Sequence, residues 1–353
     1  MNNIKKPKLL ILYAEVMSYT LSTLESIQSQ NVDLYVLHWD KKKISSYVIN
    51  SKKKLKFYNY SKFTTRELIS FSIDLDPDLV VISGWNDIKY VMVACFLRRI
   101  GKKVVCSMDN QWRGTIKQRF AVLISNRLFL NFFFTHTWIA GIEQYEYARK
   151  LGFKNSEIIW DAYCADLKIF NDIKIKRNFD SNKKLVFVGR LEIEKGIDKL
   201  LDAWKKISNK NNWELEIIGE GTLSYLIKQD SKDIKYTPFL QPEKLVNKLK
   251  ESHALILPSI FEPWGVVLQE AVACGLPVIA SEKVGSSNKF LINNFNGYKF
   301  SFSKNSSNNL VSVLKKLINL SEKDLESFSN ASLSLARKIE TSSSVANILS
   351  VLD

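Results

Sequence analysis

Short apolar runs alternate with stretches of helical periodicity along the first half of the chain. Runs of this length between helical patterns predict buried parallel strands that are joined by crossover helices. We expect strands at Leu9–Tyr13, Leu34–Leu37, Leu79–Ile82, Lys103–Ser107, Thr137–Ala140 and Ile158–Trp160, and helices at Tyr19–Gln30, Asp87–Ile100 and Ile142–Leu151. The pattern predicts one doubly wound α/β domain over residues 1–170.

The same alternation begins again after a polar stretch. Residues 171–183 are rich in Asn, Asp and Lys, and we interpret them as an interdomain linker. Further strands are expected at Leu185–Val188, Glu214–Ile218, Ile234–Tyr236, Ala254–Leu257, Val278–Ala280 and Gly297–Phe300, and helices at Ile197–Ile207, Thr222–Gln229, Pro242–Glu251, Gly265–Cys274 and, roughly, Asn308–Leu352. We therefore expect a second doubly wound domain over residues 184–335 and a cleft between the two domains.

Two carboxylates, Glu262 and Glu270, lie in the most informative segment of the chain. The helix expected at Gly265–Cys274 is apolar around most of its circumference, so it is predicted to be buried with Glu270 inside it. Glu262 lies in the preceding loop, beyond the carboxyl end of a strand, where ligands bind in open α/β sheets. An unpaired buried carboxylate is costly. Both carboxylates therefore need donors, either from nearby protein groups or from a ligand that brings hydroxyls.

A second group of candidates follows the strand at Leu185–Val188. Gly189 ends this strand and a helix begins near Gly196, so Arg190 and Lys195 lie in the loop before a helix N-terminus. That end of a helix disfavours cations unless an anion joins them, and cations beside exposed amides form a receptor for phosphate oxygens. The alternative is local pairing of these cations with Glu192, Glu194 or Asp198.

Two glycines, Gly219 and Gly221, surround Glu220 at the next strand end. Glycines there allow the backbone to approach a ligand closely, although a simple turn explains them equally well.

In combination, these segments resemble the retaining GT-B glycosyltransferases of the family 4 type. The resemblance runs from about Leu185 to Phe300. It depends on the order and spacing of Phe-Val-Gly-Arg-Leu with Glu-Lys-Gly, Ile-Ile-Gly-Glu-Gly, Leu-Pro-Ser, Glu-Pro-Trp-Gly with the second Glu, and Gly-Leu-Pro-Val-Ile-Ala-Ser. It implies a GT-B fold of two Rossmann-like domains facing a central cleft, a nucleotide-sugar donor, no metal and no other cofactor. It also implies that the C-terminal helix, residues 336–353, packs back on the first domain.

The resemblance assigns roles to individual residues. Arg190 and Lys195 would hold the donor diphosphate and form the catalytic set together with Glu262. Glu262 would contact hydroxyls of the transferred sugar, and Glu270 would bind the ribose hydroxyls. The implied donor-binding residues are Gly189, Arg190, Lys195, Gly219, Glu220, Gly221, Glu262, Pro263, Trp264, Gly265, Val266, Leu268 and Glu270.

The first half of the chain departs from the family in two loops. Tyr13–Val16 stands where many members carry paired glycines, and Ser107–Trp112 stands where many carry a histidine. Glu15, Asp109 and Asn110 are acceptor-side candidates because they follow strand ends. Each is equally open to interpretation as a loop cap.

Charge is distributed unevenly along the 353 residues, which carry a net charge of +15. Residues 1–178 hold 28 Lys+Arg against 16 Asp+Glu, whereas the remainder holds 23 against 20. No acidic residue lies between Asn110 and Ile142, where cations alternate with aromatic side chains. This segment is either a partly buried helix with solvated cations or a surface that contacts anionic lipid headgroups. The second interpretation predicts an anionic membrane as a partner. Nucleic acid is not expected, because no nucleic-acid module signature is present.

The positions of cysteine, histidine and apolar residues argue against a disulfide-rich, a zinc-binding and a membrane-spanning protein. The scattered cysteines and histidines argue against a disulfide framework and a zinc site. The apolar stretch at 120–134 is too short to span a bilayer. We therefore expect a cytoplasmic protein, with peripheral attachment to the inner face of the plasma membrane as an option.

The predicted function is retaining transfer of a sugar, of the hexosyltransferase type, from a nucleotide-diphosphate sugar to a glycan acceptor. We favour a lipid-linked acceptor and a role in bacterial cell-surface polysaccharide synthesis, such as lipopolysaccharide, O-antigen or capsule. The alternatives are a non-catalytic nucleotide-sugar-binding paralogue, a nucleotide-sugar epimerase and a phosphorylase on the same fold.

Overall fold

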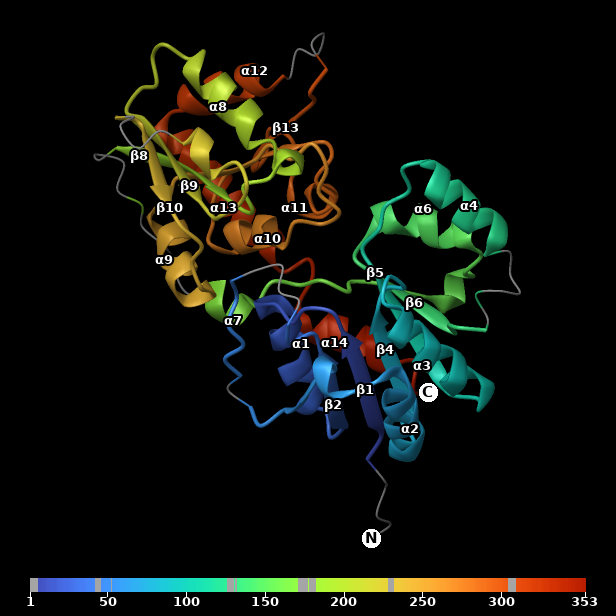
Figure 1. The fold of residues 1–353 in the computed structure, drawn as a ribbon. Coiled ribbons are helices and arrows are strands. Elements are labelled where there is room, and N and C mark those ends of the chain that lie inside the picture. The colour runs from blue at the N-terminus through green and yellow to red at the C-terminus, as the bar shows by residue number, and fades with distance from the viewer. Residues whose placement is uncertain are drawn as a thin grey trace. The chain divides into compact units, whose positions relative to one another are not determined.

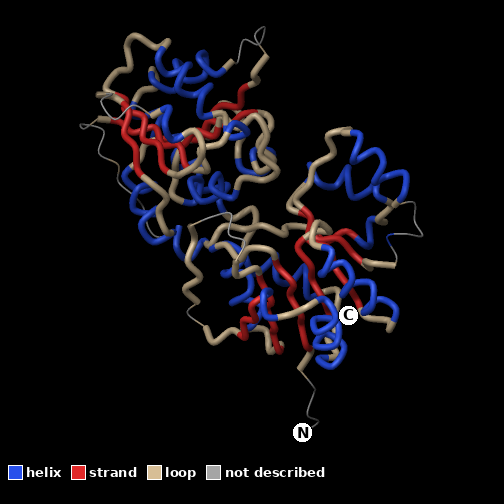
Figure 2. The backbone as a smooth tube through the Cα atoms, viewed as in Figure 1, coloured by secondary structure: helices blue, strands red, loops and turns tan. Residues whose placement is uncertain are grey.

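A computed structural model describes most of the chain as two compact units, each built on one parallel sheet (Figures 1 and 2). The first unit comprises Met1–Cys164 together with Thr341–Asp353, and the second comprises Ala165–Glu340. The described residues are 6–41, 46–51, 53–125, 130, 132–170, 177, 182–227, 232–303 and 309–353. Among their helices, none has both the length and the apolar character that a membrane span requires.

The first unit has a seven-stranded parallel sheet in the order β3-β2-β1-β4-β5-β6-β7. Its strands are β1 (Lys8–Tyr13), β2 (Asp33–His38), β3 (Lys56–Asn59), β4 (Leu79–Ser83), β5 (Lys103–Met108), β6 (His136–Ile139) and β7 (Ile158–Ile159). Its helices include α1 (Ser18–Gln28), α2 (Thr65–Leu75), α3 (Ile88–Arg99), α4 (Ile116–Ile124), α6 (Ile142–Leu151) and α14 (Thr341–Leu349). The central strands β1 and β4 are continuous apolar runs because helices cover both faces of the sheet.

The C-terminal helix α14 belongs to the first unit. It packs against α1, and in Figure 1 the red α14 lies beside the blue α1. Val345, Ile348 and Val351 are buried in the same apolar cluster as the inward face of α1. The Lys103 ammonium group donates to the Val351 carbonyl at 2.6 Å. The chain therefore returns to its first unit after it has completed the second.

The second unit has a six-stranded parallel sheet in the order β10-β9-β8-β11-β12-β13. Its strands are β8 (Lys183–Val188), β9 (Trp213–Ile218), β10 (Ile234–Thr237), β11 (Ala254–Leu257), β12 (Val278–Ser281) and β13 (Gly297–Phe300). Its helices include α7 (Leu167–Phe170), α8 (Ile197–Lys205), α9 (Pro242–Glu251), α10 (Val266–Ala273), α11 (Ser287–Phe290), α12 (Leu310–Ile318) and α13 (Glu322–Ala336). The strand order reverses between β8 and β11, and such a switch point is where doubly wound sheets bind ligands.

The segment at the predicted boundary near residue 170 packs with the second unit. Helix α7 contacts α9 and α10, and the Ala165 amide donates to Oε1 of Gln269 at 2.8 Å. Gln269 also donates to the carbonyls of Ala336 and Ile339. One buried glutamine thus holds both ends of the second unit. Of the predicted linker, residues 171–176 and 178–181 lie outside the described residues.

The helix expected at Thr222–Gln229 is wrong as far as the described residues extend. They contain only the single 3₁₀ turn Ser224–Leu226. The Leu223 amide donates to the Leu191 carbonyl at 2.8 Å, and the Ser224 hydroxyl donates to the Gly221 carbonyl at 2.7 Å. Local bonds of this kind compete with the helical ladder and favour turns.

Candidate active site

Loops that follow four strands gather at the carboxyl edge of the second sheet. The β8 and β9 loops are joined where the Leu191 amide donates to the Glu220 carbonyl at 2.8 Å. The β11 and β12 loops are joined where the Gly285 amide donates to the Glu262 carbonyl at 3.1 Å. These bonds make one continuous surface from segments that lie far apart in sequence.

The β8 loop also packs directly on the β11 loop. Amides of Ile260 and Phe261 donate to the Glu194 carbonyl at 2.8 and 3.2 Å. Gly196, at the start of α8, has a φ of +68°, and a Cβ added there would lie 2.0 Å from the Pro258 carbonyl oxygen. The N-terminus of α8 is therefore fixed against the end of β11, and its amides point to the loop edge.

Lys195 and Glu262 meet at the centre of this surface. The Lys195 ammonium group contacts the Glu262 carboxylate directly, and 15% and 12% of the two side chains are exposed. The structure thus brings together two site residues that the sequence predicted in separate motifs. Glu262 receives its donor from within the protein.

Arg190 shows the local pairing that was the alternative interpretation. Its guanidinium donates to Oε1 of Glu194 at 3.0 Å, and both side chains are about half exposed. Exposed ion pairs contribute little to stability. Arg190 can therefore exchange Glu194 for an anionic ligand at small cost.

Glu270 is buried in α10, as predicted. Within the described part of the chain, no residue donates a hydrogen bond to its carboxylate. Burial, with the negative charge of Asp166 as a second cause, raises the pKa of Glu270 to about 8. In this structure the side chain therefore favours its protonated form at neutral pH. A ligand with hydroxyl donors would favour the ionised form instead.

The loop before α10 and the start of α11 carry buried polar atoms that have no hydrogen-bond partner among the described residues. Trp264 is buried, its backbone carbonyl accepts from the Ser286 amide at 2.9 Å, and Gly265 caps the helix. Among the described residues, nothing bonds to Nε1 of Trp264 or to the hydroxyls of Ser259 and Ser287. Buried polar atoms of this kind are rare in folded proteins. Ser259 and Ser287 were missed in the sequence analysis because a lone serine carries no motif. The adjoining predicted residues Pro263, Val266 and Leu268 belong to this loop and the first turn of α10.

Packing within the protein explains why the β9 loop contains glycines. A Cβ at Gly219 would lie 1.9 Å from the Gly189 carbonyl oxygen, and one at Gly221 would lie 2.5 Å from the Leu191 carbonyl oxygen. The close approach that requires glycine is thus between the β8 and β9 loops.

The acceptor-side candidates lie at strand ends of the first sheet. Glu15 follows β1 and is partly exposed, while Asp109 and Asn110 follow β5. The Asp109 carbonyl accepts from the buried Gln144 side chain at 3.0 Å. The sequence analysis missed Tyr13, whose hydroxyl lies 3.3 Å from that of Ser107 and whose pKa is raised by burial to about 12.

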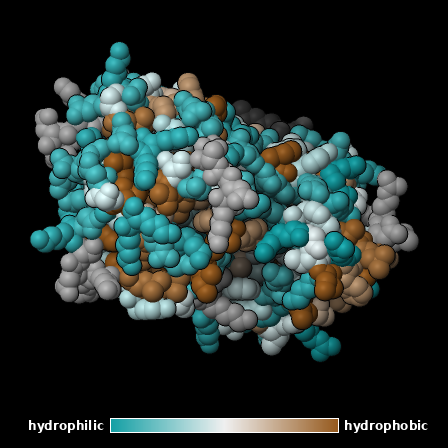
Figure 3. Space-filling view, turned by 90° about the horizontal axis from the view of Figure 1, so that it is seen from above, coloured by the Kyte–Doolittle hydropathy of each residue, from teal (hydrophilic) through white to brown (hydrophobic). Residues whose placement is uncertain are grey.

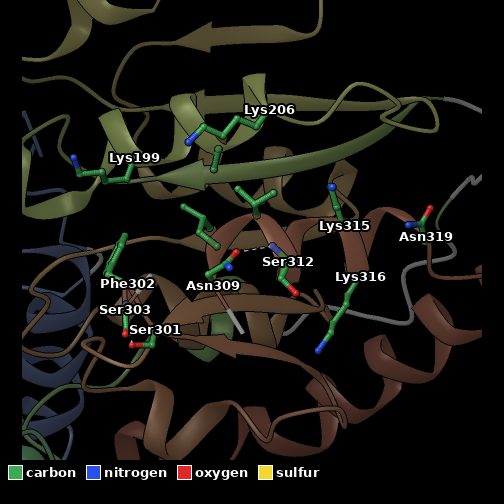
Figure 4. A pocket seen from close by; sticks show the side chains of 13 residues that line it. Lys199, Lys206, Ser301, Phe302, Ser303, Asn309, Ser312, Lys315, Lys316 and Asn319 are labelled. Atoms are coloured by element: carbon green, nitrogen blue, oxygen red, sulfur yellow. Dashed lines mark hydrogen bonds between the residues drawn. The ribbon is translucent and has the colours of Figure 1, made fainter. Parts of the chain in front are cut away.

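Two further observations concern other possible ligand sites. Among the residues that the structure describes, no three His, Cys, Asp or Glu side chains converge as metal ligands. A groove between α8 and α12 is lined by Lys199, Lys206, Lys315 and Lys316 (Figure 4). It contains none of the predicted donor residues, so it is separate from the surface that holds Lys195 and Glu262.

Comparison with known sequences finds similarity to glycosyltransferases within the second unit. The family model described as glycosyl transferases group 1 matches residues 169–333. An uncharacterised glycosyltransferase of Methanocaldococcus jannaschii is 34% identical over 125 residues, which are 33% of this chain and 32% of that protein. A GDP-mannose-dependent alpha-mannosyltransferase of Corynebacterium glutamicum is 29% identical over 116 residues, which are 32% of this chain and 27% of that protein. The matches span about a third of the length of these relatives.

Comparison with solved structures covers nearly the whole chain. HepE of Anabaena in complex with UDP and glucose aligns with a TM-score of 0.74 and 15% identity, over 98% of this chain and 99% of that one. WaaG, a glycosyltransferase involved in lipopolysaccharide biosynthesis, aligns with a TM-score of 0.68 and 12% identity over 98% and 99%. These likenesses show the fold, which is the GT-B fold that the sequence predicted.

Proposed function

We propose that the protein, whose residues 169–333 match the family model of the glycosyl transferases group 1, is a retaining glycosyltransferase of the hexosyltransferase type. It transfers a sugar from a nucleotide-diphosphate donor to a glycan acceptor. The observation that carries the proposal is the contact of Lys195 with Glu262 at the carboxyl edge of the sheet, inside the matched segment.

The chemistry follows from the charges at this edge. As the bond between the sugar carbon and the phosphate oxygen breaks, negative charge develops on the leaving nucleoside diphosphate. Arg190, Lys195 and the N-terminus of α8 stabilise that charge where it develops. The acceptor oxygen forms the new bond on the same face, and its proton passes to the departing phosphate oxygen. In this proposal neither a dedicated base nor a metal is needed.

The two carboxylates orient the donor. Glu262 is held by Lys195 at the entrance of α10 and accepts hydrogen bonds from hydroxyls of the sugar. Glu270, which has no donor among the described residues, accepts from the ribose hydroxyls. Nε1 of Trp264, for which the described residues offer no partner, is a further donor in the same loop as Glu262.

We further propose a lipid-linked acceptor and a place in bacterial cell-surface polysaccharide synthesis at the cytoplasmic face of the membrane. Support comes from the fold shared with WaaG, which acts in lipopolysaccharide biosynthesis. The basic first half of the chain gives independent support, since anionic membranes attract such surfaces.

A transfer assay tests the proposal. The protein is incubated with labelled UDP-, GDP-, TDP- and ADP-sugars and a panel of lipid-linked acceptors. We expect Glu262→Ala and Arg190→Ala each to reduce transfer at least about a hundredfold. Glu262 orients the sugar, and Arg190 stabilises the charge on the leaving diphosphate. Lys199→Ala, a charge change in the separate groove, is the matched control.

Three results would overturn the proposal. Transfer that survives both substitutions would remove the assigned site. Donor binding without transfer to any acceptor would favour the non-catalytic alternative. Inorganic phosphate as the only productive acceptor would favour a phosphorylase.

A further inference from the structure

Helix α4 of the first unit has an exposed apolar face, which no other element among the described residues covers. None of its side chains is classed as buried. Ile116, Phe120, Leu123 and Ile124 are 88%, 61%, 75% and 45% exposed. At about 100° of rotation per residue they lie within one arc of ~100°. Four large apolar side chains on one exposed arc form a continuous stripe, which scattered exposure does not produce.

Cations border this stripe on both sides. On the same helical projection, Lys117 lies next to Ile124, and Arg119 lies next to Leu123. No acidic residue occurs between Asn110 and Ile142, so no carboxylate offsets these charges within the segment. The inward side of α4 carries Ala121 and Val122, which pack against the apolar core of the first unit. An apolar stripe between two basic edges is typical of helices that lie in a membrane interface.

A basic hollow adjoins α4 at the end of α6. Its lining includes Val122 of α4 together with Arg149, Lys150 and Lys154, and no acidic residue is among the lining side chains. Its volume of about 900 Å³ is within the range of small-ligand sites, roughly 300–1,000 Å³.

The cations of this hollow are available to a ligand. Lys150 and Lys154 lie 3.6 and 3.8 Å from Glu146 and Glu157, in pairs that are partly exposed to solvent and therefore weak. Arg149 donates to the Phe153 carbonyl at 2.6 Å, which fixes its guanidinium at the wall.

We infer that the α4 stripe and this basic hollow form one membrane-docking surface. The stripe lies in the headgroup region of an anionic bilayer, and the hollow takes the phosphate of an anionic headgroup. Hydrophobic side chains gather on the right of Figure 3, where the first unit carries α4 in Figure 1. This inference rests on the proposed function for the lipid-linked acceptor. It adds to that function the surface that binds the membrane and the kind of membrane that it binds.

Charge decides between a bilayer and other occupants. A second copy packed on α4 would bring Lys117 and Arg119 against their own counterparts, and the segment between Asn110 and Ile142 has no acid to offset them. An anionic bilayer supplies negative charge on both sides of the stripe and an apolar layer beneath it. The bilayer is therefore the occupant to which we commit.

Sedimentation of the full chain with vesicles tests the apolar part. The vesicles are phosphatidylcholine with and without phosphatidylglycerol. We expect the double variant Phe120→Glu/Leu123→Glu to bind anionic vesicles at least about tenfold more weakly, because two large apolar side chains no longer enter the interface. Both positions are exposed, so the fold tolerates the change, and a thermal melt verifies it. Tyr225→Glu, at a side chain of the second unit that is 76% exposed, is the control and keeps wild-type binding.

A second pair of variants tests the hollow. Arg149→Gln/Lys150→Gln/Lys154→Gln and Lys199→Gln/Lys206→Gln/Lys315→Gln remove the same charge from the two units. The first triple should lose at least about tenfold in affinity, and the second much less. Equal losses would overturn the assignment of the hollow.

Two other outcomes would overturn the docking surface. One is unchanged binding of the Phe120→Glu/Leu123→Glu variant. The other is a wild-type dimer without vesicles that this variant dissociates, since a second copy would then cover α4. The shift in melting temperature on addition of nucleotide sugars, measured without vesicles, reports donor binding independently of membrane binding. The docking variants should retain the wild-type shift, whereas a wild type without any shift would contradict the proposed function and leave the docking result intact.

Discussion

At the residue scale, Glu270 is a carboxylate in an unusual environment. It is buried in α10 and has no described donor, and its pKa is raised to about 8. Glu262, eight positions earlier, is satisfied by Lys195. The motif contains both glutamates, but only the folded loops decide which of them already has a donor from within the protein.

Replacing Glu270 with Gln should change how stability depends on pH. The unfolded glutamate titrates near its ordinary pKa of 4.5 and the folded one near 8. Between these values the folded state binds more protons, so stability falls as pH rises through this window. Relative to Glu270→Gln, the wild type should lose on the order of a few kcal/mol between about pH 5 and pH 8. Urea unfolding at a series of pH values measures this difference.

The control for this prediction is Glu282→Gln, at an exposed carboxylate of the same unit. It should follow the wild-type curve. A wild type and a Glu270→Gln variant with parallel pH profiles would show that Glu270 finds a donor in solution.

The residue-level prediction from sequence succeeded where the apolar pattern of one helix decides whether a side chain is buried. The burial of Glu270 followed from the apolar circumference of α10. The partner of Arg190 remained open, because Glu192, Glu194 and Asp198 are all within reach along the chain. Ser259 and Ser287 were missed since only the meeting of two loops makes them notable.

At the scale of elements, the junction between the β8 loop and α8 determines where Lys195 points. Gly196 combines a left-handed backbone with the close approach of Pro258. Gly101 has a similar φ of +83° but no neighbour within 4 Å of an added Cβ. The two glycines therefore separate the cost of backbone conformation from the cost of a steric clash.

Gly196→Ala should destabilise the second unit by at least about 3 kcal/mol. The added Cβ would strain the left-handed backbone at position 196 and would also push the β11 loop away. Gly101→Ala should cost only about 1–2 kcal/mol from conformation alone. Chemical denaturation gives both values. Donor-dependent thermal shifts should be lost in Gly196→Ala and retained in Gly101→Ala. Equal destabilisation in the two variants would show that the β11 loop adjusts freely.

Helices and strands with a clear hydrophobic pattern were predicted well, whereas elements with a weak pattern were missed. The strands at the sheet centres followed from continuous apolar runs. The edge strand β3 and the helix α2 were not predicted, although Thr64 and Glu67 form a capping box at the start of α2. Residues 222–227 show the opposite error, in which a helix was predicted and is not present. Hydrogen bonds to the carbonyls of Gly221 and Leu191 hold these residues in a turn.

At the scale of the whole molecule, the chain crosses between its units twice. Two doubly wound domains could be predicted because the alternation of strands and helices restarts after residue 183. The unit to which the last residues belong was implied by family resemblance alone. No pattern in Thr341–Leu349 distinguishes a helix of the second unit from one that packs on α1.

The return of α14 makes the first unit depend on the last residues of the chain. Ile348 is fully buried among side chains of α1 and β1. Ile348→Ala should cost about 2–5 kcal/mol through lost burial and a cavity. The loss should fall on the first unit, since the cavity opens there and the second unit keeps its own core. Hydrogen exchange resolved by segment should therefore show faster exchange in β1 and α1 and unchanged exchange in β8 and β11. Ser343→Ala, on the exposed side of α14, should change neither. Faster exchange in β8 as well would contradict this prediction and would mean that the two units unfold together.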